Sequence, residues 1–343
     1  MMNLEKIKKM LKQDSFIGDE ITDKLKPKDY IFSGSYLLNC LITADPFKGL
    51  PSNKIIQLAG DSSTGKTFLS QELVINAQKQ GYEVVYIDTE GAQDAEQLVK
   101  RGIDLNKFMI VPQNTVEEVQ FTLMSILEGV DPEKDKIMIV LDSLGNLSTK
   151  KEVEDTISDS NKKDMTRAQE VKKLFRLLAL RSSYKQVPVI IINHTYSTQS
   201  FISKVVVSGG KGAAYGATTT IILSKSKDKD KDGNVNGVFL KAKTDQKSRL
   251  ARENMVANLY VSYAKGLDKY YGLTEIAEAC GYLKKESKKY EYKGELYKVV
   301  PTEILDELLA GEFGEKLKSL FAYGSDLKII NDEEESNEYT EEI

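Results

Sequence analysis

One glycine-rich stretch, residues 60–67, carries the residue types that bind phosphate. It is Gly60-Asp61-Ser62-Ser63-Thr64-Gly65-Lys66-Thr67, which matches the pattern G-x-x-x-x-G-K-[ST]. An apolar run precedes it, and a stretch with helical spacing of apolar residues follows it from Phe68 onward. Strand, loop and helix in this order form a nest of backbone N–H groups at the positive end of a helix dipole. The pattern predicts that Lys66 binds the β- and γ-phosphates of a nucleotide and that the Thr67 hydroxyl is a Mg²⁺ ligand.

Three further polar residues follow or end apolar runs that are typical of strands. Asp142 ends the run 137–142, an arrangement in which a carboxylate holds Mg²⁺ directly or through water. Glu90 follows the run 84–88 and could polarise the water that attacks the γ-phosphate; a solvated loop carboxylate is the alternative. His194 follows the run 187–193 and could sense the γ-phosphate, but the pattern fits a histidine bonded to a nearby carbonyl equally well. Because parallel strands end at one edge of their sheet, we expect all three residues to face the phosphate loop.

Strand-like apolar runs alternate with helical periodicity from residue 54 onward. The expected strands are Ile55–Ala59, Val84–Asp88, Phe108–Val111, Ile137–Asp142 and Val187–Asn193, and the expected helices are Phe68–Gln80, Ala92–Arg101, Val116–Leu127 and Met165–Arg181. Thr218–Leu223 and Gly237–Lys243 predict a hairpin around Asp232-Gly233-Asn234, and Met255–Tyr263 a further strand. Most of the runs are nearly continuous in Ile and Val, which is typical of parallel strands buried on both faces. The predicted fold class is therefore α/β, with a doubly wound and mostly parallel sheet.

Composition limits the classes of protein to which the chain can belong. Its 343 residues are 41% hydrophobic and 29% charged, as in soluble globular proteins. The formal net charge of −4 means that any nucleic-acid-binding surface must be local. The two cysteines, Cys40 and Cys280, match no metal spacing, His194 is the only histidine, and the apolar runs are too short to span a bilayer. We expect a cytoplasmic protein with no membrane contact.

The two ends of the chain differ from the α/β region. Leu4, Ile7, Met10 and Leu11 recur at helical spacing and predict a small amphipathic helix, whereas residues 29–50 are expected to be irregular. Residues 271–315 carry two amphipathic helical spacings, and the chain ends in seven acidic residues with no base after position 331. We predict four regions: an N-terminal segment (1–50), an α/β core (51–270), a small C-terminal α(+β) lobe (271–330) and an acidic, disordered tail (331–343).

These motifs occur in the order and spacing of the RecA-type recombinases, which the chain resembles over about residues 54–281. The shared strings are Gly60–Thr67, Tyr86-Ile87-Asp88-Thr89-Glu90, Ile139-Val140-Leu141-Asp142-Ser143 and Ile191-Ile192-Asn193-His194. More narrowly, residues 141–147, 164–168 and 192–196 resemble the UvsX recombinases of T-even-type phages. The resemblance implies a RecA-like P-loop NTPase core that uses ATP and Mg²⁺, with residues 1–50 as an assembly segment.

The resemblance also implies a role for each matching residue. The implied nucleotide site comprises Gly60, Asp61, Ser62, Ser63, Thr64, Gly65, Lys66, Thr67, Phe68 and Asp142. Glu90 matches the catalytic glutamate, and His194 takes the place of a glutamine that links ATP to a DNA-binding loop. Lys247 and Arg249 resemble paired basic residues that reach the neighbouring protomer's ATP and stabilise transition-state charge. Gln97 departs from the family, which usually carries an adenine-stacking tyrosine there, so base selectivity is expected to be looser or arranged differently.

Two DNA-binding loops are implied by the resemblance, at residues 151–164 and 195–212. The first loop holds at least as many acids as bases, so charge does not mark it as a DNA ligand. Single-strand binding needs a basic groove with aromatic side chains, and glycines allow close approach to phosphate. The candidate DNA-binding residues are Arg167, Lys172, Arg176, Tyr196, Phe201, Lys204, Gly209, Gly210, Lys211 and Gly212. For Phe201, a small hydrophobic cluster under the loop is the alternative.

Together these inferences predict a DNA-dependent ATPase that carries out homologous recombination. It would form a helical filament on single-stranded DNA, pair that strand with homologous duplex DNA and exchange strands, with roles in repair and replication. Further expected partners are copies of the same chain arranged head to tail, a single-stranded-DNA-binding protein and a loading mediator. The compartment would be the cytoplasm, that of the host if the chain is phage-encoded. Two alternatives stay open: a RecA-fold hexameric DNA helicase, and a mediator that binds ATP and DNA without turnover.

Overall fold

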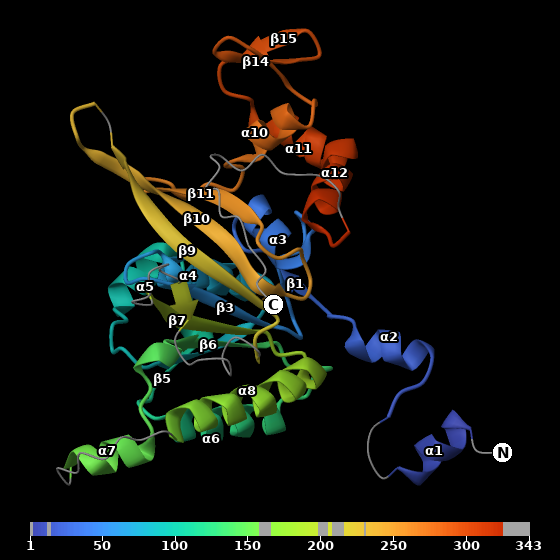
Figure 1. Ribbon diagram of the computed structural model, residues 1–343, viewed down its shortest axis with the longest axis vertical. Coiled ribbons are helices and arrows are strands. Elements are labelled where there is room, and N and C mark those ends of the chain that lie inside the picture. Colours follow the sequence, from blue (N-terminus) through green and yellow to red (C-terminus); the bar gives the residue numbers. More distant parts are fainter. Residues whose placement is uncertain are drawn as a thin grey trace, which may run out of the picture.

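A ten-stranded sheet forms the centre of the molecule (Figure 1). The computed structural model describes residues 3–11, 15–157, 166–197, 205–207, 216–229 and 231–324. The strand order is β12-β11-β10-β9-β3-β7-β6-β4-β5, and β8 pairs with β7. The strands are β3 (Ile55–Gly60), β4 (Glu83–Asp88), β5 (Phe108–Pro112), β6 (Ile137–Asp142), β7 (Val189–Ser197), β8 (Val205–Val207), β9 (Thr219–Lys229), β10 (Val235–Ser248), β11 (Val256–Ser262) and β12 (Gly266–Leu267). The strands from β9 to β5 in this order run parallel, which confirms the predicted α/β class.

Helices cover both faces of the parallel strands and explain their continuous apolar sequences. Helices α4 (Lys66–Lys79) and α5 (Ala95–Arg101) lie on one face, and α6 (Val116–Gly129) and α8 (Thr166–Lys185) on the other (Figure 1). Successive residues of a strand point to opposite faces, so each strand feeds two cores. In β7, Ile190 packs in the core with α4, whereas Ile191 packs in the core with α6 and α8.

Short polar signals fix where these helices begin and end. Thr115 and Glu118 form a capping box at the start of α6, in which each side chain accepts from the other's backbone N–H. Asp94 caps α5 by accepting a hydrogen bond from the N–H of Gln97. Helix α5 then ends at Gly102, whose φ of 96° is a conformation that favours glycine. These polar and glycine residues set the first residues of α5 and α6 and the last residue of α5.

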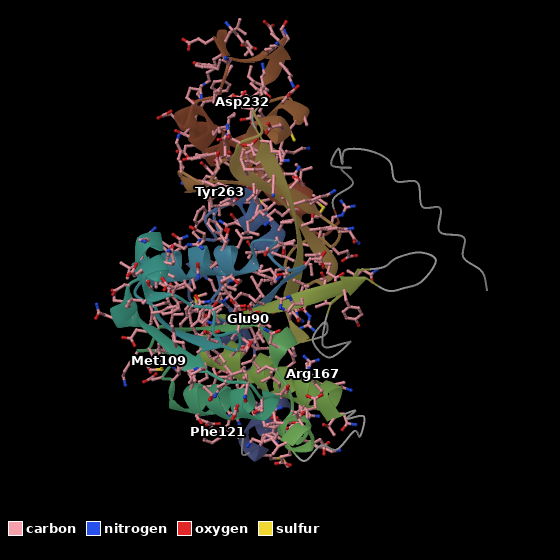
Figure 2. The ribbon with its side chains drawn as sticks, turned by 90° about the vertical axis from the view of Figure 1, so that its left-hand side faces the viewer. Glu90, Met109, Phe121, Arg167, Asp232 and Tyr263 are labelled. Atoms are coloured by element: carbon pink, nitrogen blue, oxygen red, sulfur yellow. The ribbon has the colours of Figure 1, made fainter. Side chains whose placement is uncertain are left out.

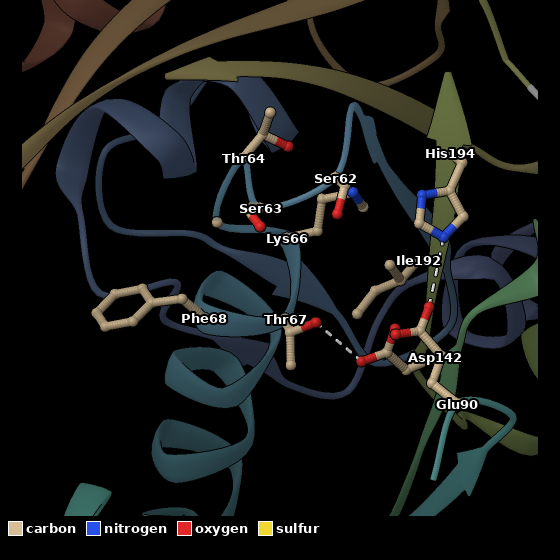
Figure 3. Close-up of a pocket in the computed structure, with 11 residues that line it drawn as sticks. Ser62, Ser63, Thr64, Lys66, Thr67, Phe68, Glu90, Asp142, Ile192 and His194 are labelled. Atoms are coloured by element: carbon tan, nitrogen blue, oxygen red, sulfur yellow. Dashed lines mark hydrogen bonds and ion pairs between the residues drawn. The ribbon is translucent and has the colours of Figure 1, made fainter. Parts of the chain in front are cut away.

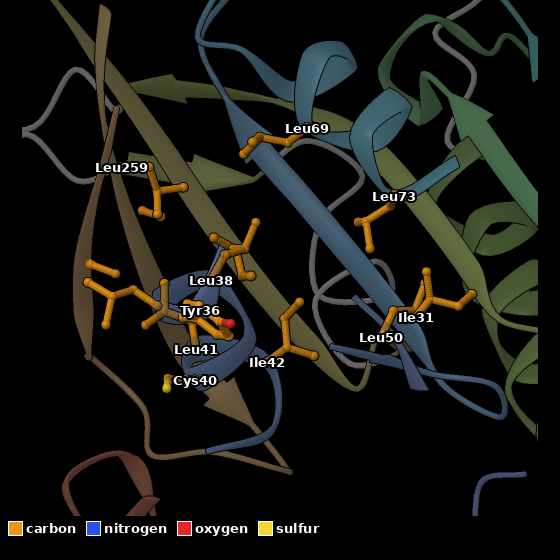
Figure 4. Packing of buried hydrophobic residues seen from close by; sticks show 14 of the residues in the cluster. Ile31, Tyr36, Leu38, Cys40, Leu41, Ile42, Leu50, Leu69, Leu73 and Leu259 are labelled. Atoms are coloured by element: carbon orange, nitrogen blue, oxygen red, sulfur yellow. The ribbon is translucent and has the colours of Figure 1, made fainter. Parts of the chain in front are cut away.

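The N-terminal region has two exposed helices and one buried helix. It comprises α1 (Leu4–Met10), α2 (Asp19–Leu25), β1 (Tyr30–Ile31), α3 (Tyr36–Thr43) and β2 (Leu50–Pro51). Helix α1 buries no residue and lies at the outside of the molecule (Figure 1), whereas α2 contacts α8. The prediction that residues 29–50 are irregular was wrong, because α3 lies there with seven buried residues. A helix that is apolar on all sides has no amphipathic period for sequence analysis to detect. Its side chains belong to the same buried cluster as Leu69, Leu73 and Leu259 (Figure 4).

The antiparallel part of the sheet extends further than predicted. β9 and β10 form a hairpin that projects beyond the body (Figure 1), and their pairing continues to Lys229 and Val235. The first predicted strand of the hairpin ends at Leu223 and the second begins at Gly237, so the Lys-, Ser- and Asp-rich outer part of the hairpin was not predicted as strand. Exposed strands carry such residues where both faces meet solvent. At the opposite edge, Met109 of β5 and Phe121 of α6 are exposed (Figure 2).

The C-terminal region contains three helices and a small antiparallel sheet. Its elements are α10 (Leu273–Ala279), β13 (Lys284–Glu286), β14 (Lys289–Tyr292), β15 (Glu295–Tyr297), α11 (Thr302–Ala310) and α12 (Glu312–Phe321). This content agrees with the expected α(+β) lobe. None of the helices in the described ranges has the length and apolarity that a membrane span requires.

Candidate nucleotide-binding site

A pocket of about 250 Å³ lies at the carboxyl ends of β3, β4, β6 and β7 (Figure 3). Its lining consists of Ser62, Ser63, Thr64, Gly65, Lys66, Thr67, Phe68, Glu90, Asp142, Ile192 and His194. Parallel pairing of β3, β7, β6 and β4 aligns the ends of these strands. Four segments that are far apart in the sequence therefore meet at the sheet edge where ligands of open α/β sheets bind.

The phosphate loop wraps around the Lys66 ammonium. Lys66 Nζ donates hydrogen bonds to the carbonyls of Gly60 (3.0 Å) and Asp61 (2.7 Å). Burial lowers the pKa of Lys66, while the nearby carboxylates of Asp142, Glu90 and Asp61 act in the opposite direction. A Cβ on Gly60 would lie 2.5 Å from the carbonyl oxygen of Leu223, so the loop needs glycine to pass β9. The loop thus keeps an open cradle with a cation at its base, which fits a phosphate group.

Thr67 and Asp142 form the pair of oxygen donors expected for Mg²⁺. Thr67 Oγ1 donates to Asp142 Oδ2 at 3.0 Å, and the Tyr86 hydroxyl donates to the same oxygen. Gln93 Nε2 in turn donates to the Tyr86 hydroxyl at 2.9 Å. Burial raises the pKa of Asp142, and the hydrogen bonds from Tyr86 and Thr67 counteract this. Mg²⁺ favours one or two protein oxygens together with substrate phosphates and water, so this pair fits the ion.

Glu90 is held by three neighbouring side chains. Its Oε1 atom accepts hydrogen bonds from Ser143 Oγ (3.0 Å) and Asn146 Nδ2 (3.0 Å), and His194 Nε2 lies 3.4 Å away. Ser143 Oγ is also 3.2 Å from His194 Nε2. The carboxylate therefore faces the pocket in a fixed orientation, which a group that directs an attacking water requires.

Ser143 and Asn146 belong to a turn to which the sequence analysis gave no role. The turn contains a short 3₁₀ helix, η2 (Leu144–Asn146), directly after β6. The string 141–147 had entered only as part of the resemblance. The sequence did contain a signal for their role. Ser143 and Asn146 are polar residues that follow Asp142, at the end of a strand, by one and four positions.

A sequence profile described as the RecA N-terminal domain matches residues 1–268. The chain belongs to the RecA family. A protein of Enterobacteria phage T4 named "Recombination and repair protein" is 31% identical over 260 residues, which cover 75% of this chain and 66% of the phage protein. "Protein RecA" of Mesoplasma florum is 28% identical over 280 residues, 81% of this chain and 80% of the relative. "Protein RecA" of Arthrobacter sp. strain FB24 is 26% identical over 281 residues, 81% of this chain and 76% of the relative. The resemblance to RecA-type recombinases is confirmed.

In this RecA-family protein, the residues expected to bind DNA lie in different settings. Lys172 and Arg176 are exposed on α8, and Tyr196 is exposed near the end of β7. Arg167 instead donates from its guanidinium to the carbonyls of Leu144 (3.2 Å), Gly145 (3.0 Å) and Leu147 (2.8 Å). The remaining candidates lie outside the described residues: Phe201, Lys204, Gly209, Gly210, Lys211 and Gly212.

Both expected DNA loops contain regular structure where they are described. The first begins as helix α7 (Lys150–Ile157), and residues 158–164 lie outside the described residues. At the base of the second, β8 pairs with the end of β7. Thr195 Oγ1 donates to Asp61 Oδ1 at 2.8 Å. This hydrogen bond joins the start of the second loop to the glycine-rich loop 60–67.

Lys247 and Arg249 lie at the far end of the sheet from the pocket. Ser248 pairs with Thr219 at the start of β9, whereas the pocket lies where the parallel strands end. Arg249 is exposed, and the side chain of Lys247 is outside the described part of the chain. Among the described side chains, Arg249 does not line the pocket. Gln97 is exposed and also does not line it.

Proposed function

We propose that this RecA-family protein is an ATP-dependent homologous recombinase. It polymerises on single-stranded DNA, pairs that strand with homologous duplex DNA and hydrolyses ATP to ADP and phosphate when DNA is bound. One observation carries the proposal: Lys66, Thr67, Asp142 and Glu90 converge in one pocket beside His194. Family membership, and relatives named for recombination and repair or as RecA, support the same function.

The proposed hydrolysis assigns a separate task to each side chain. The loop N–H groups and Lys66 bind the β- and γ-phosphates. Mg²⁺ held at Thr67 and Asp142 supplies charge neutralisation on the phosphates. Glu90 orients the attacking water and accepts its proton. Ser143 and Asn146 hold Glu90 in place through their bonds to Oε1.

The proposed coupling between ATP and DNA runs along β7. His194 lies beside Glu90 in the pocket, and Thr195 bonds to Asp61 of the phosphate loop. Tyr196 follows at an exposed position. A movement of His194 caused by the γ-phosphate would therefore be passed directly to Thr195 and Tyr196. These two residues lead into the second loop.

Exposed apolar residues at opposite parts of the molecule support assembly with further copies of the chain. Leu4 and Met10 of α1 are 65% and 69% exposed, and Met109 of the edge strand β5 is 60% exposed. An interface between two different surfaces of one protein propagates head to tail and gives a filament when it does not close. In such a filament Lys247 and Arg249 face the nucleotide of the neighbour. We place this activity in the cytoplasm, that of the host if a phage encodes the chain, with a single-stranded-DNA-binding protein and a loading mediator as further partners.

The test measures ATP hydrolysis with and without single-stranded DNA, together with electron microscopy of the same mixtures. Wild type, Glu90→Gln and the control Glu133→Gln, at an exposed glutamate that pairs with Lys28, are compared. DNA-stimulated turnover that only Glu90→Gln abolishes, with open filaments on the strand, supports the recombinase. Closed rings that unwind duplex without homology support the helicase instead. DNA binding without turnover supports the mediator, and turnover that ignores DNA leaves an unassigned NTPase.

A further inference from the structure

The turn 143–147 presents three backbone carbonyls, those of Leu144, Gly145 and Leu147, of which Leu144 also accepts a long hydrogen bond (3.4 Å) from the Leu147 N–H. The last carbonyls of a helical turn need a donor from elsewhere, and an arginine can supply several at once from its planar guanidinium. Arg167 fills this need, with Nε bonded to the Leu147 carbonyl and one terminal nitrogen bonded to the carbonyls of Leu144 and Gly145. The first turn of α8 is therefore fastened to the turn that follows β6.

The other side of the same turn holds the candidate catalytic carboxylate. Asn146 and Ser143 both donate to Glu90 Oε1 at 3.0 Å. Gly145, between them, lies against the His194 ring, since a Cβ on Gly145 would be 2.7 Å from His194 Cδ2. Any shift of the turn therefore displaces the two donors that orient Glu90.

We infer that Arg167 is a positioning residue that holds Glu90 in its hydrolytic orientation through the turn 143–147. The inference rests on the proposed ATPase function and specifies a route by which DNA regulates it. Sequence reasoning had placed Arg167 among the DNA ligands. All the hydrogen bonds that its guanidinium makes go instead to the three carbonyls of the turn, among the described residues.

Helix α8 is suited to transmit a force to this turn. It is 20 residues long, and Val171, Leu174, Phe175 and Leu178 anchor its apolar face in the core with α6. Tightly packed helices move as units rather than deforming. Lys172 and Arg176 lie exposed on the same helix, five and nine residues beyond Arg167. Phosphate contacts at these two residues would shift α8, and Arg167 passes the shift to the turn and so to Glu90.

The test compares Arg167→Lys with wild type. Lysine keeps the charge but is a compact point donor that cannot bridge three carbonyls in a fixed plane. We expect kcat for ATP hydrolysis to fall by about 10- to 100-fold, the loss typical of a catalytic group displaced by about 1 Å. The KM for ATP and the Kd for single-stranded DNA stay unchanged, because Lys66 and the exposed bases of α8 are untouched. DNA stimulation of the remaining turnover is lost.

Asn146→Ala provides a second variant that does not depend on the fit of a new side chain. Asn146 is exposed, so its truncation leaves the core intact, and we expect the same loss in kcat at unchanged KM. The double variant of Arg167→Lys with Asn146→Ala should lose no more than Asn146→Ala alone, because both residues act through one path. Arg181→Lys is the matched control, since Arg181 lies on the same helix and pairs with Glu128 instead. It should hydrolyse ATP like wild type.

Two outcomes overturn the inference in distinguishable ways. An active wild type with an equally active Arg167→Lys shows that Arg167 does not position Glu90. If Arg167→Ala then weakens DNA binding and reduces its salt dependence by about one charge, Arg167 is a DNA ligand. A wild type without ATP turnover overturns the proposed function itself, and the inference with it.

Discussion

Asp142 combines the burial of a core residue with the charge that a metal site needs. It is only 3% exposed, and burial is the largest influence on its pKa, which is raised. A carboxyl group whose pKa is higher in the folded than in the unfolded state favours folding below its unfolded pKa. That contribution is lost as the pH rises through the folded pKa. At neutral pH the ionised carboxylate therefore costs stability, and the proposed binding of Mg²⁺ and nucleotide would offset that cost.

Replacing this carboxylate with an amide should separate stability from function. We expect nucleotide-free Asp142→Asn to unfold at a higher temperature than wild type at neutral pH, because no buried charge remains. The difference should shrink as the pH falls towards about 4, the ordinary pKa of an aspartate. Mg²⁺-dependent hydrolysis should be lost in the same variant. Thermal melts monitored by circular dichroism across this range measure the first effect.

Asp23→Asn serves as the control, because Asp23 is exposed on α2. Its melting temperature should follow wild type at every pH. If Asp142→Asn is less stable than wild type at neutral pH, the hydrogen bonds from Thr67 and Tyr86 outweigh the cost of burial.

At the scale of elements, the phosphate loop depends on one backbone conformation. Gly65 has a φ of 92°, which a residue with a side chain adopts only under strain, and a Cβ there would lie 3.1 Å from Leu240 of β10. We expect Gly65→Ala to lower the free energy of unfolding by about 1–2 kcal/mol and to weaken ATP binding, because the adjacent Lys66 N–H must move. Urea unfolding and nucleotide titration measure the two effects.

The same substitution at the end of α6 should act in the opposite direction. Gly129 has no positive φ and no atom within 4 Å of an added Cβ. Gly129→Ala should therefore stabilise the protein by up to about 1 kcal/mol through helix propensity and leave ATP binding unchanged. Equal behaviour of the two variants would mean that the loop tolerates a different backbone path.

Elements with a clear period could be predicted from the sequence, and elements without one could not. β3, β4 and β6 lie within about one residue of their predicted bounds, because buried parallel strands are continuous apolar runs between polar loops. Helix α3 was missed because it is buried on all sides and has no polar stripe. The outer half of β9 lay beyond the predicted strand end at Leu223, because its mostly exposed residues form no apolar run.

The candidate site shows the same division. Lys66, Thr67 and Asp142 lie in motifs whose spacing is set by phosphate and metal chemistry, so their meeting in one pocket could be expected. The partners of Glu90 could not, because Asn146 reaches it across 56 positions of the chain through the path of a short turn. For Arg167 the positive charge led to a prediction of DNA binding. In the structure its guanidinium instead donates hydrogen bonds to backbone carbonyl groups.

For the whole molecule, the exposed N-terminal helix predicts how copies of the chain associate. Because α1 buries no residue in its own protomer, substitutions on its apolar side should leave the fold intact. We expect Leu4→Glu combined with Met10→Glu to abolish filaments on single-stranded DNA and the turnover that depends on them. Nucleotide binding by the monomer should persist. Sedimentation and electron microscopy of the same samples measure the change.

Lys9→Glu is the matched control, since Lys9 is exposed on the side of the same helix opposite Leu4 and Met10. Filaments should form as in wild type. Filaments that survive the double substitution would show that another surface carries the assembly contact.

The net charge of −4 hides a strong asymmetry, because residues 332–342 contain seven acids and no base. Without residues 331–343 the chain has a net positive charge, and single-stranded DNA is a polyanion that such a tail repels or displaces. We expect a chain ending at residue 330 to bind single-stranded DNA about tenfold more tightly at low salt. The difference should vanish at high salt, where charges further apart than a few ångströms no longer interact.

A full-length chain whose tail acids are replaced by Asn and Gln is the control. It should behave like the truncated chain, because the substitutions remove the charge of the tail and keep its length. Fluorescence anisotropy across a salt series measures all three proteins; if the neutral tail binds DNA like wild type, length and not charge sets the effect.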